Sequence, residues 1–233
     1  MYKKIDKSFS SYNMITFALL LLIADSLGYN CRWPSNNSQR LEWLAELVHR
    51  SQTILNQFNR PSWISQGTLL GSVRDGVILE WTGDADVQMF DHDMADICNS
   101  TSLINMVFRA ANLTIYDCKE GFLRICLANV DNEPKPSFLE ADKFTPYAAL
   151  ELYSCTRRAD GLYLIKEMPC LWNFSTLFPL QLYNLSSKVK AWGPADAIYF
   201  IEQYYGRNWT TPVYYSGDRT LSDICQGRLH QKK

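Results

Sequence analysis

Two aspartates separated by a single residue stand inside an apolar run in the stretch GSVRDGVILEWTGDADVQM, residues 71–89. Side chains alternate between the two faces of a β-strand, so Asp84 and Asp86 would share one face. Carboxylates held side by side repel each other unless one is protonated or a cation lies between them. The pair therefore predicts a site for Mg²⁺ or Mn²⁺, which take oxygen ligands and bind nucleotide phosphates.

A glycine and a serine at the start of the same stretch, Gly71 and Ser72, are predicted to form a turn that binds a phosphate through backbone N–H groups. Ser72 could donate a hydrogen bond to that phosphate, or it could cap a helix. Arg74 would neutralise the phosphate through its planar guanidinium, or it could form a surface ion pair. A Gly-Ser turn followed by an Asp-x-Asp strand is typical of the nucleotidyltransferase-like fold.

The elements that must position these residues follow from hydrophobic periodicity and from turn residues. Helices are predicted over 38–59 and 94–111, and a third from Pro194 to Tyr205 with Gly206 as its stop. Strands are predicted within SWISQGTLLGS and over 76–81, 85–90, 113–119, 122–130 and 137–144. These elements indicate an α+β fold, in which a mixed β-sheet packs with helices and an aromatic-rich C-terminal helical region follows.

The stretch WISQGTLLGSVRDGVILEWTGDADVQM resembles the LicD/fukutin family, whose hallmark is G-T-L-L-G-x-x-R, a short apolar segment, a tryptophan and closely spaced aspartates. The matching positions are Gly67 to Gly71, Arg74, Trp81, Asp84 and Asp86. The segment LFPLQLYNLSSKVKAWGPADAIYFIEQYYGRNWTTPVY is similar to the closing region of the family, and the resemblance runs from Gln39 to Tyr215. Bacterial members often carry a further Asp directly after the tryptophan, where this chain has Thr82 and Gly83.

The resemblance implies a metal-dependent enzyme that transfers an alcohol phosphate, such as phosphocholine or ribitol phosphate, from a CDP-alcohol to a glycan or glycoprotein. It also implies a third carboxylate on the strand 137–144, where Glu140 and Asp142 face the same way. Asp142 is the favoured catalytic and metal-binding residue, and Glu140 is the second choice, in contact with the substrate. An exposed edge strand with solvated acids is the alternative for this segment.

Two other functions stay open. The chain could be a pseudoenzyme of the secretory lumen, or a secreted one, that binds a glycan or a partner enzyme without turnover. Alternatively, an enzyme of the same fold could transfer the nucleotide itself. The aromatic side chains Trp81, Tyr205 and Trp209 could line the substrate pocket, although core packing is the commoner role of such residues.

The N-terminal segment, residues 1–28, is predicted to direct the chain into the secretory pathway. Three lysines, Lys3, Lys4 and Lys7, precede the apolar run MITFALLLLIA, which fits either a cleaved signal peptide or a type II membrane anchor. Both place a single domain, residues 29–233, in the endoplasmic reticulum or Golgi lumen or outside the cell. N-x-[ST] sequons agree with that location and begin at Asn36, Asn99, Asn112, Asn173, Asn184 and Asn208.

The charge argues against a nucleic-acid partner, and the cysteines predict disulfides rather than a zinc site. The formal net charge is −1 and the basic residues are scattered, so no nucleic acid is expected as a partner. The chain has 7 cysteines and no C-x-x-C spacing, which disfavours a zinc site. In an oxidising lumen this number predicts two or three disulfides and a leftover thiol, and a bridge between Cys31 and Cys225 is one possibility.

Overall fold

The computed structural model describes residues 30–31, 34, 36–129, 148–166 and 168–211. The predicted targeting segment 1–28 and the predicted strand 137–144, with Glu140 and Asp142, lie outside the described residues. Within the described part, none of the helices combines the length and the apolar character that crossing a bilayer requires.

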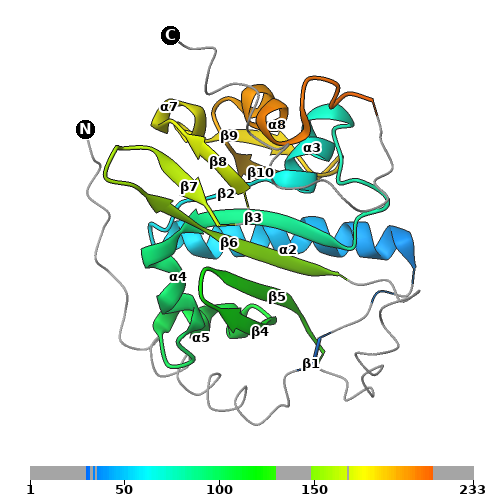
Figure 1. The fold of residues 1–233 in the computed structure, drawn as a ribbon. Helices are drawn as coiled ribbons and strands as arrows, with labels where there is room; N and C mark the ends of the chain where they lie inside the picture. The colour runs from blue at the N-terminus through cyan, green and yellow to red at the C-terminus, as the bar shows by residue number, and fades with distance from the viewer. Residues whose placement is uncertain (1–29, 32–33, 35, 130–147, 167, 212–233) are drawn as a thin grey trace, which may run out of the picture.

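A mixed β-sheet forms the centre of the molecule and confirms the predicted α+β class (Figure 1). Strand β3 (Asp84–Phe90) pairs in parallel with β6 (Ala149–Arg157), and the strand order is β1-β5-β6-β3-β2. The other strands of this sheet are β1 (Asn30–Cys31), β2 (Ser62–Ile64), β4 (Leu113–Lys119), β5 (Phe122–Asn129), β7 (Tyr163–Ile165) and β8 (Met168–Trp172). A separate two-stranded sheet consists of β9 (Gln181–Asn184) and β10 (Lys190–Gly193).

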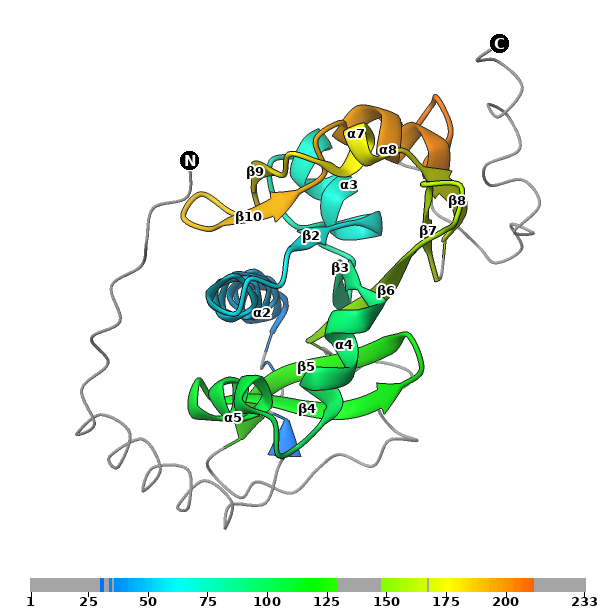
Figure 2. The ribbon, with the colours of Figure 1, turned by 90° about the vertical axis from the view of Figure 1, so that its left-hand side faces the viewer.

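Helix α2 (Asn37–Gln57) packs against β3, β5 and β6, and Figure 2 shows it end-on beside the sheet. The Asn36 side chain caps the helix by accepting a hydrogen bond from the backbone N–H of Gln39. Leucine side chains at helical spacing, including Leu44, Leu47 and Leu55, are fully buried against the sheet. The helix predicted over 38–59 is thus confirmed.

Two further helices, α3 (Gln66–Arg74) and α8 (Ala197–Tyr205), pack against each other, and α3 also packs against β3 (Figure 1). Helix α8 begins three residues later than predicted, because the Asp196 side chain accepts a hydrogen bond from the backbone N–H of Tyr199 and caps the helix there. Its predicted end is confirmed, since Gly206 follows with φ +82°.

Three predicted elements differ from the structure. The helix expected over 94–111 is two helices, α4 (Asp91–Cys98) and α5 (Leu103–Ala110), because the Ser102 hydroxyl caps a new helix by accepting from the N–H of Asn105. The strand expected over 76–81 is a loop in which Ile78 and Leu79 are buried, and the Ile78 N–H donates to the carbonyl of Leu185, the residue after β9. The C-terminal region is not mainly helical, since it contains β7 to β10 besides α7 (Phe174–Leu177) and α8.

Disulfides tie the edge of the sheet to its neighbours. Cys31 on β1 is bonded to Cys126 on β5, and Cys98 at the end of α4 is bonded to Cys118 on β4. Cys155 is a free, buried thiol. Cys170 is disulfide-bonded as well. The predicted two or three disulfides with a leftover thiol are therefore confirmed, whereas the bridge between Cys31 and Cys225 is wrong, because Cys31 is bonded to Cys126.

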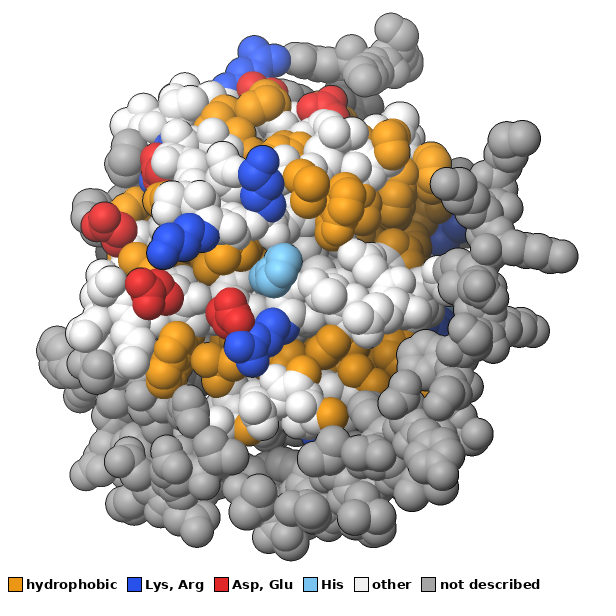
Figure 3. Space-filling model, turned by 180° about the vertical axis from the view of Figure 1, so that it is seen from behind, with side chains coloured by type: hydrophobic (Ala, Val, Ile, Leu, Met, Phe, Trp, Pro, Cys, Tyr) orange, Lys and Arg blue, Asp and Glu red, His pale blue; other side chains and the backbone are white. Residues whose placement is uncertain are grey.

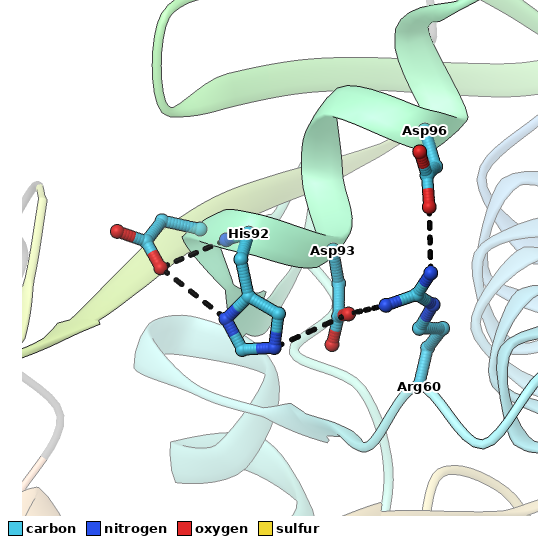
Figure 4. A network of polar contacts seen from close by, with 5 residues as sticks. Arg60, His92, Asp93 and Asp96 are labelled. Carbon is cyan, nitrogen blue, oxygen red and sulfur yellow. Dashed lines mark hydrogen bonds and ion pairs between the residues drawn. The ribbon is translucent and has the colours of Figure 1, made fainter.

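Helix α4 is joined to the loop between α2 and β2 by a network of polar contacts (Figure 4). Arg60 forms ion pairs with Asp93 and with Asp96, the latter at 2.6 Å. His92 lies 3.4 Å from Asp93 and its ring stacks on Phe90, while its side chain is largely exposed. These contacts fix the position of α4 relative to the helix before β2.

Seen from behind, the surface carries acidic and basic side chains that are interspersed rather than gathered by sign (Figure 3). Hydrophobic side chains lie between them and form a broader group on one side of this face (Figure 3). The charges on this face therefore create no large field of a single sign.

Candidate functional site

Three carboxylates from two neighbouring strands form the candidate site. Asp84 and Asp86 extend from β3, and Glu151 extends from β6. The parallel pairing places Asp86 directly opposite Glu151, so all three side chains share one face of the sheet. Oxygen atoms of the three carboxylates all lie within 4.8 Å of one another. The shared face of Asp84 and Asp86 is as predicted.

Asp86 is the more deeply buried of the two aspartates, with only 7% of its surface exposed. Its Oδ2 accepts a hydrogen bond of 3.1 Å from the backbone N–H of Gly67, and its own N–H donates to the Thr68 hydroxyl. Burial raises the pKa of Asp86 well above its ordinary value, and the neighbouring charges of Asp84 and Glu151 raise it further. The α3 N-terminus therefore holds this carboxylate in a fixed position.

Asp84 is more accessible, because it lies at the first position of β3. Its Oδ1 accepts a hydrogen bond of 2.8 Å from the Thr82 hydroxyl. Burial again raises the pKa of Asp84, partly opposed by the Thr82 hydrogen bond and reinforced by the charge of Glu151. The same pocket thus contains one deep and one accessible aspartate, both disposed to bind a cation or a proton.

Glu151 is held by partners on both of its oxygens. Arg124 on β5 donates to Oε1 at 2.7 Å, and the Tyr153 hydroxyl donates to Oε2 at 2.5 Å. Burial and the hydrogen bond to Glu151 raise the pKa of Tyr153, so this phenol remains protonated. The guanidinium offsets part of the negative charge that the three acids bring together.

A pocket of about 360 Å³ opens in front of the two aspartates. Aromatic side chains form much of its wall: Trp81, Tyr153, Tyr205 and Trp209. Trp81 is 55% exposed, and the Arg74 guanidinium lies 5.6 Å from the centre of its ring. A larger hollow of about 590 Å³ at the far ends of β3 and β6 has none of the three acids in its lining. The smaller pocket is therefore the candidate binding site, because it contains both aspartates. Its aromatic lining suits a flat or sugar-like ligand.

The turn predicted at Gly71 and Ser72 is wrong. Both residues lie inside α3, and neither belongs to the lining of the pocket. The Ser72 hydroxyl donates to the Asn184 carbonyl, which joins α3 to β9. A Cβ atom at Gly71 would lie 2.6 Å from the Val77 carbonyl oxygen, so glycine allows the following loop to pack closely on the helix.

Arg74 does line the pocket, but its guanidinium is engaged with a neighbour. It donates two hydrogen bonds to the Asp75 carboxylate, at 2.9 and 2.7 Å. These bonds raise the pKa of Arg74 and lower that of Asp75. The surface ion pair foreseen for Arg74 is thus present, and the side chain lies at the mouth of the pocket as well.

Glu151 was missed by the sequence-based reasoning, which expected the third acid at Asp142 or Glu140. Its signal was nevertheless present, because Glu151 is an isolated acid within the apolar run AALELYS. The same kind of signal marks Asp86 within ADVQMF. Only the pairing of β3 with β6 shows that these two acids meet.

The chemistry of the three acids fits a hard divalent cation. Each supplies an oxygen ligand, and the close spacing of three carboxylates is costly for the folded chain without a compensating positive charge. Arg124 donates a hydrogen bond to Glu151, and the two aspartates line the pocket. Asp84, Asp86 and Glu151 are thus the residues that could hold Mg²⁺ or Mn²⁺.

The sequence matches a known protein family. Residues 59–189 match the model of the family described as LicD/FKTN/FKRP, nucleotidyltransferase domain. Over 180 residues, or 72% of the chain, the sequence is 25% identical to ribitol-5-phosphate transferase FKTN of Homo sapiens, and equally to that of Macaca fascicularis. The chain spans 33% of the length of each of these relatives.

Two solved structures match the chain with low scores. A crystal structure of ANT(2")-Ia with adenylyl-2"-tobramycin is 12% identical with a TM-score of 0.40, covering 64% of this chain and 68% of that one. Lincosamide adenylyltransferase LnuA, in a lincomycin-bound crystal structure, is 10% identical with a TM-score of 0.38, covering 66% of this chain and 84% of that one.

Proposed function

The chain belongs to the LicD/FKTN/FKRP family of nucleotidyltransferase domains, and on that premise we propose that it transfers an alcohol phosphate from a CDP-alcohol to a glycan hydroxyl. Phosphocholine and ribitol phosphate are the alcohol phosphates in question. The curated relatives are ribitol-5-phosphate transferases, which favours ribitol phosphate.

One observation carries this proposal. Asp84 and Asp86 on β3 line a pocket with an aromatic wall, and Glu151 on β6 completes a cluster of three carboxylates with them. Acids so placed are suited to hold a divalent cation against a diphosphate, and aromatic rings are suited to bind a nucleotide base or a sugar. A single pocket therefore offers a binding surface both for the diphosphate and for the base or sugar of a nucleotide-linked donor.

Asp84, Asp86 and Glu151 would hold Mg²⁺ or Mn²⁺. When bound, such an ion would neutralise charge on the donor phosphates. The chain's own residues would orient the reactants: Gly67 and Thr68 fix Asp86, while Arg124 and Tyr153 fix Glu151. Alignment of this kind supplies most of the rate in phosphoryl transfer, because the protein has little covalent chemistry to do.

In the proposed reaction a glycan hydroxyl attacks the phosphorus atom that bears the alcohol. A new oxygen–phosphorus bond forms, the bond to the nucleotide phosphate breaks, and CMP leaves. Asp84 is the accessible acid of the cluster, and the proton of the attacking hydroxyl would pass to its carboxylate. Arg74 at the mouth of the pocket is placed to contact the departing CMP phosphate.

The secretory pathway is the proposed location. Two disulfides among the described residues are typical of an oxidising compartment. All six sequon asparagines have exposed side chains, so each is accessible to a glycosyltransferase. Treatment of the expressed protein with an N-glycosidase should increase its mobility on a gel, and an unshifted protein recovered from cytosol would contradict this location.

A donor screen tests the proposed reaction. Purified protein is incubated with Mn²⁺, a panel of CDP-alcohols and a panel of glycans, and released nucleotides are measured. CMP release that requires both the glycan and the metal supports alcohol-phosphate transfer. Release of the alcohol phosphate with attachment of CMP to the glycan would indicate nucleotidyl transfer instead. No release with any donor, in spite of metal-dependent binding of CDP, would indicate a pseudoenzyme.

A further inference from the structure

Gln66, the first residue of α3, has a backbone conformation that its side chain does not favour. Its φ is +43°, in the left-handed region. The other positive-φ residues of the described chain are glycines or asparagines, which tolerate this region better. Gln66 is therefore held in place by its surroundings at a cost in free energy, and such residues concentrate at functional sites.

The side-chain amide of Gln66 is also poorly satisfied. Its Nε2 is buried and donates to none of the described residues. Its Oε1 accepts only a long hydrogen bond of 3.5 Å from the Tyr204 hydroxyl. A buried N–H group without an acceptor destabilises the folded chain, and at a pocket-lining residue it is available to donate to a bound molecule.

Gln66 lies beside the deepest aspartate of the pocket. The residue before it, Ser65, donates its backbone N–H to the Asp86 carbonyl, and the residue after it, Gly67, donates to the Asp86 carboxylate. Gln66 itself lines the pocket together with both aspartates. The strained backbone and the unsatisfied amide are thus two independent features of one residue at the site.

We infer that Gln66 is a substrate-binding residue whose side-chain amide donates a hydrogen bond to a phosphate oxygen of the nucleotide donor. The inference deepens the proposed function and rests on it. Beside Asp86 the nearest part of a cation-bound donor is its diphosphate, which offers acceptors but no donors. An amide N–H complements such oxygens without adding charge to a site that already holds Arg74 and Arg124.

Binding of CDP and of cytidine separates this role from a structural one. Affinities are measured by calorimetry with Mn²⁺ for the wild type, Gln66→Gly and Gln66→Glu. Gln66→Gly removes the amide and relieves the left-handed strain, so the melting temperature of the metal-free protein should rise while CDP affinity falls about tenfold. Gln66→Glu replaces the donor by a carboxylate and should weaken CDP binding further. Cytidine, which has no phosphate, should bind all three proteins equally.

Asn59→Gly serves as the matched control. Asn59 has φ +56° and lies just beyond α2, outside the pocket, so this change should leave CDP affinity unaltered. Unchanged CDP affinity in both Gln66 variants would overturn the inference, as would a loss of cytidine affinity equal to that of CDP.

The measurement is independent of turnover. A wild type that binds CDP but releases no CMP contradicts the proposed function. The role of Gln66 is then still decided by the CDP and cytidine affinities of its variants. A wild type that binds no CDP in the presence of Mn²⁺ contradicts both.

Discussion

Asp86 on β3 and Glu151 on β6 are register partners in a parallel pair of strands, and each is fixed by its own set of hydrogen bonds. Backbone and hydroxyl groups of α3 hold the aspartate, whereas Arg124 and Tyr153 hold the glutamate. Acids opposite each other in adjacent strands destabilise the sheet unless a cation or a proton offsets their charge. This pair is the basis of the metal-dependent chemistry that we propose, and it leads to the following predictions.

Replacing Asp86 by Asn should separate a metal site from a structural one. The variant keeps the shape of the side chain and removes a charge that burial disfavours, so the melting temperature without metal should rise. Stabilisation by Mn²⁺ should disappear, and transfer should slow by on the order of 10² or more. Asp160→Asn is the control, because Asp160 is an exposed acid outside the pocket. Mn²⁺ that stabilises Asp86→Asn as strongly as the wild type would refute the assignment.

The stability of the metal-free protein should fall as pH rises from acid toward neutrality. Burial raises the pKa values of Asp84 and Asp86 above those of the unfolded chain, so the folded state binds more protons in this interval. Their contribution is most favourable below the ordinary pKa of Asp and is lost as pH rises through the raised values. Mn²⁺ should stabilise the protein mainly above that interval, because carboxylates must lose protons to bind metal. Melting curves from pH 4 to 8 for the wild type and for Asp84→Asn/Asp86→Asn check this, and parallel pH profiles would contradict it.

Replacing Gly71 by Ala should lower the free energy of unfolding, although Gly71 does not line the pocket. The added Cβ would lie 2.6 Å from the Val77 carbonyl oxygen and 2.9 Å from the Leu79 backbone nitrogen, and neither backbone atom can move independently. Overpacking of this kind lowers the free energy of unfolding by about 1–3 kcal/mol. At Gly67 a Cβ meets only ordinary contacts, the nearest at 3.5 Å, so Gly67→Ala should change stability much less. Urea denaturation measures both, and equal effects would argue against close packing as the role of Gly71.

The exposed ring of Trp81 should contribute to binding rather than to stability. Trp81→Ala should leave the free energy of unfolding within about 0.5 kcal/mol, as is usual for surface sites. Because stacking of a base on an aromatic ring contributes about 1–3 kcal/mol, the affinity for both CDP and cytidine should fall roughly tenfold or more. Leu103 is also 55% exposed and lies outside the pocket, so Leu103→Ala is the control for stability and for binding. Unaltered cytidine affinity in Trp81→Ala would exclude stacking on the base.

The disulfide between Cys98 and Cys118 should stabilise the α4–β4 edge of the sheet. It closes a loop with a sequence separation of 20, for which the loss of chain entropy in the unfolded state corresponds to about 3 kcal/mol. The double variant Cys98→Ser/Cys118→Ser should therefore unfold at a lower urea concentration. Cys155→Ser is the control for loss of a cysteine, since that thiol is free. Stability equal to the wild type would show that the bridge is dispensable.

The sequence alone predicted those features that depend on short-range patterns. The two-residue period of a strand placed Asp84 and Asp86 on one face, and leucines at helical spacing identified α2. Hydrophobic periodicity and turn residues predicted strands over 113–119 and 122–130, which are β4 and β5 of a hairpin in which Gly121 has φ +70°. Each of these signals lies within a few residues, so it can be recognised without knowledge of the rest of the chain.

Only the tertiary structure decided which distant residues complete the site. Glu151 joins the aspartates because β6 pairs in parallel with β3, and no local pattern specifies that register. Gly71 and Ser72 lie within a helix because the loop after it and strand β9 pack against them. The strand expected over 76–81 is a loop because its contacts are with a distant segment: Ile78 and Leu79 are buried, and the Ile78 N–H donates to the Leu185 carbonyl rather than to a neighbouring strand. Local propensity is a weak preference, and burial against distant segments outweighs it.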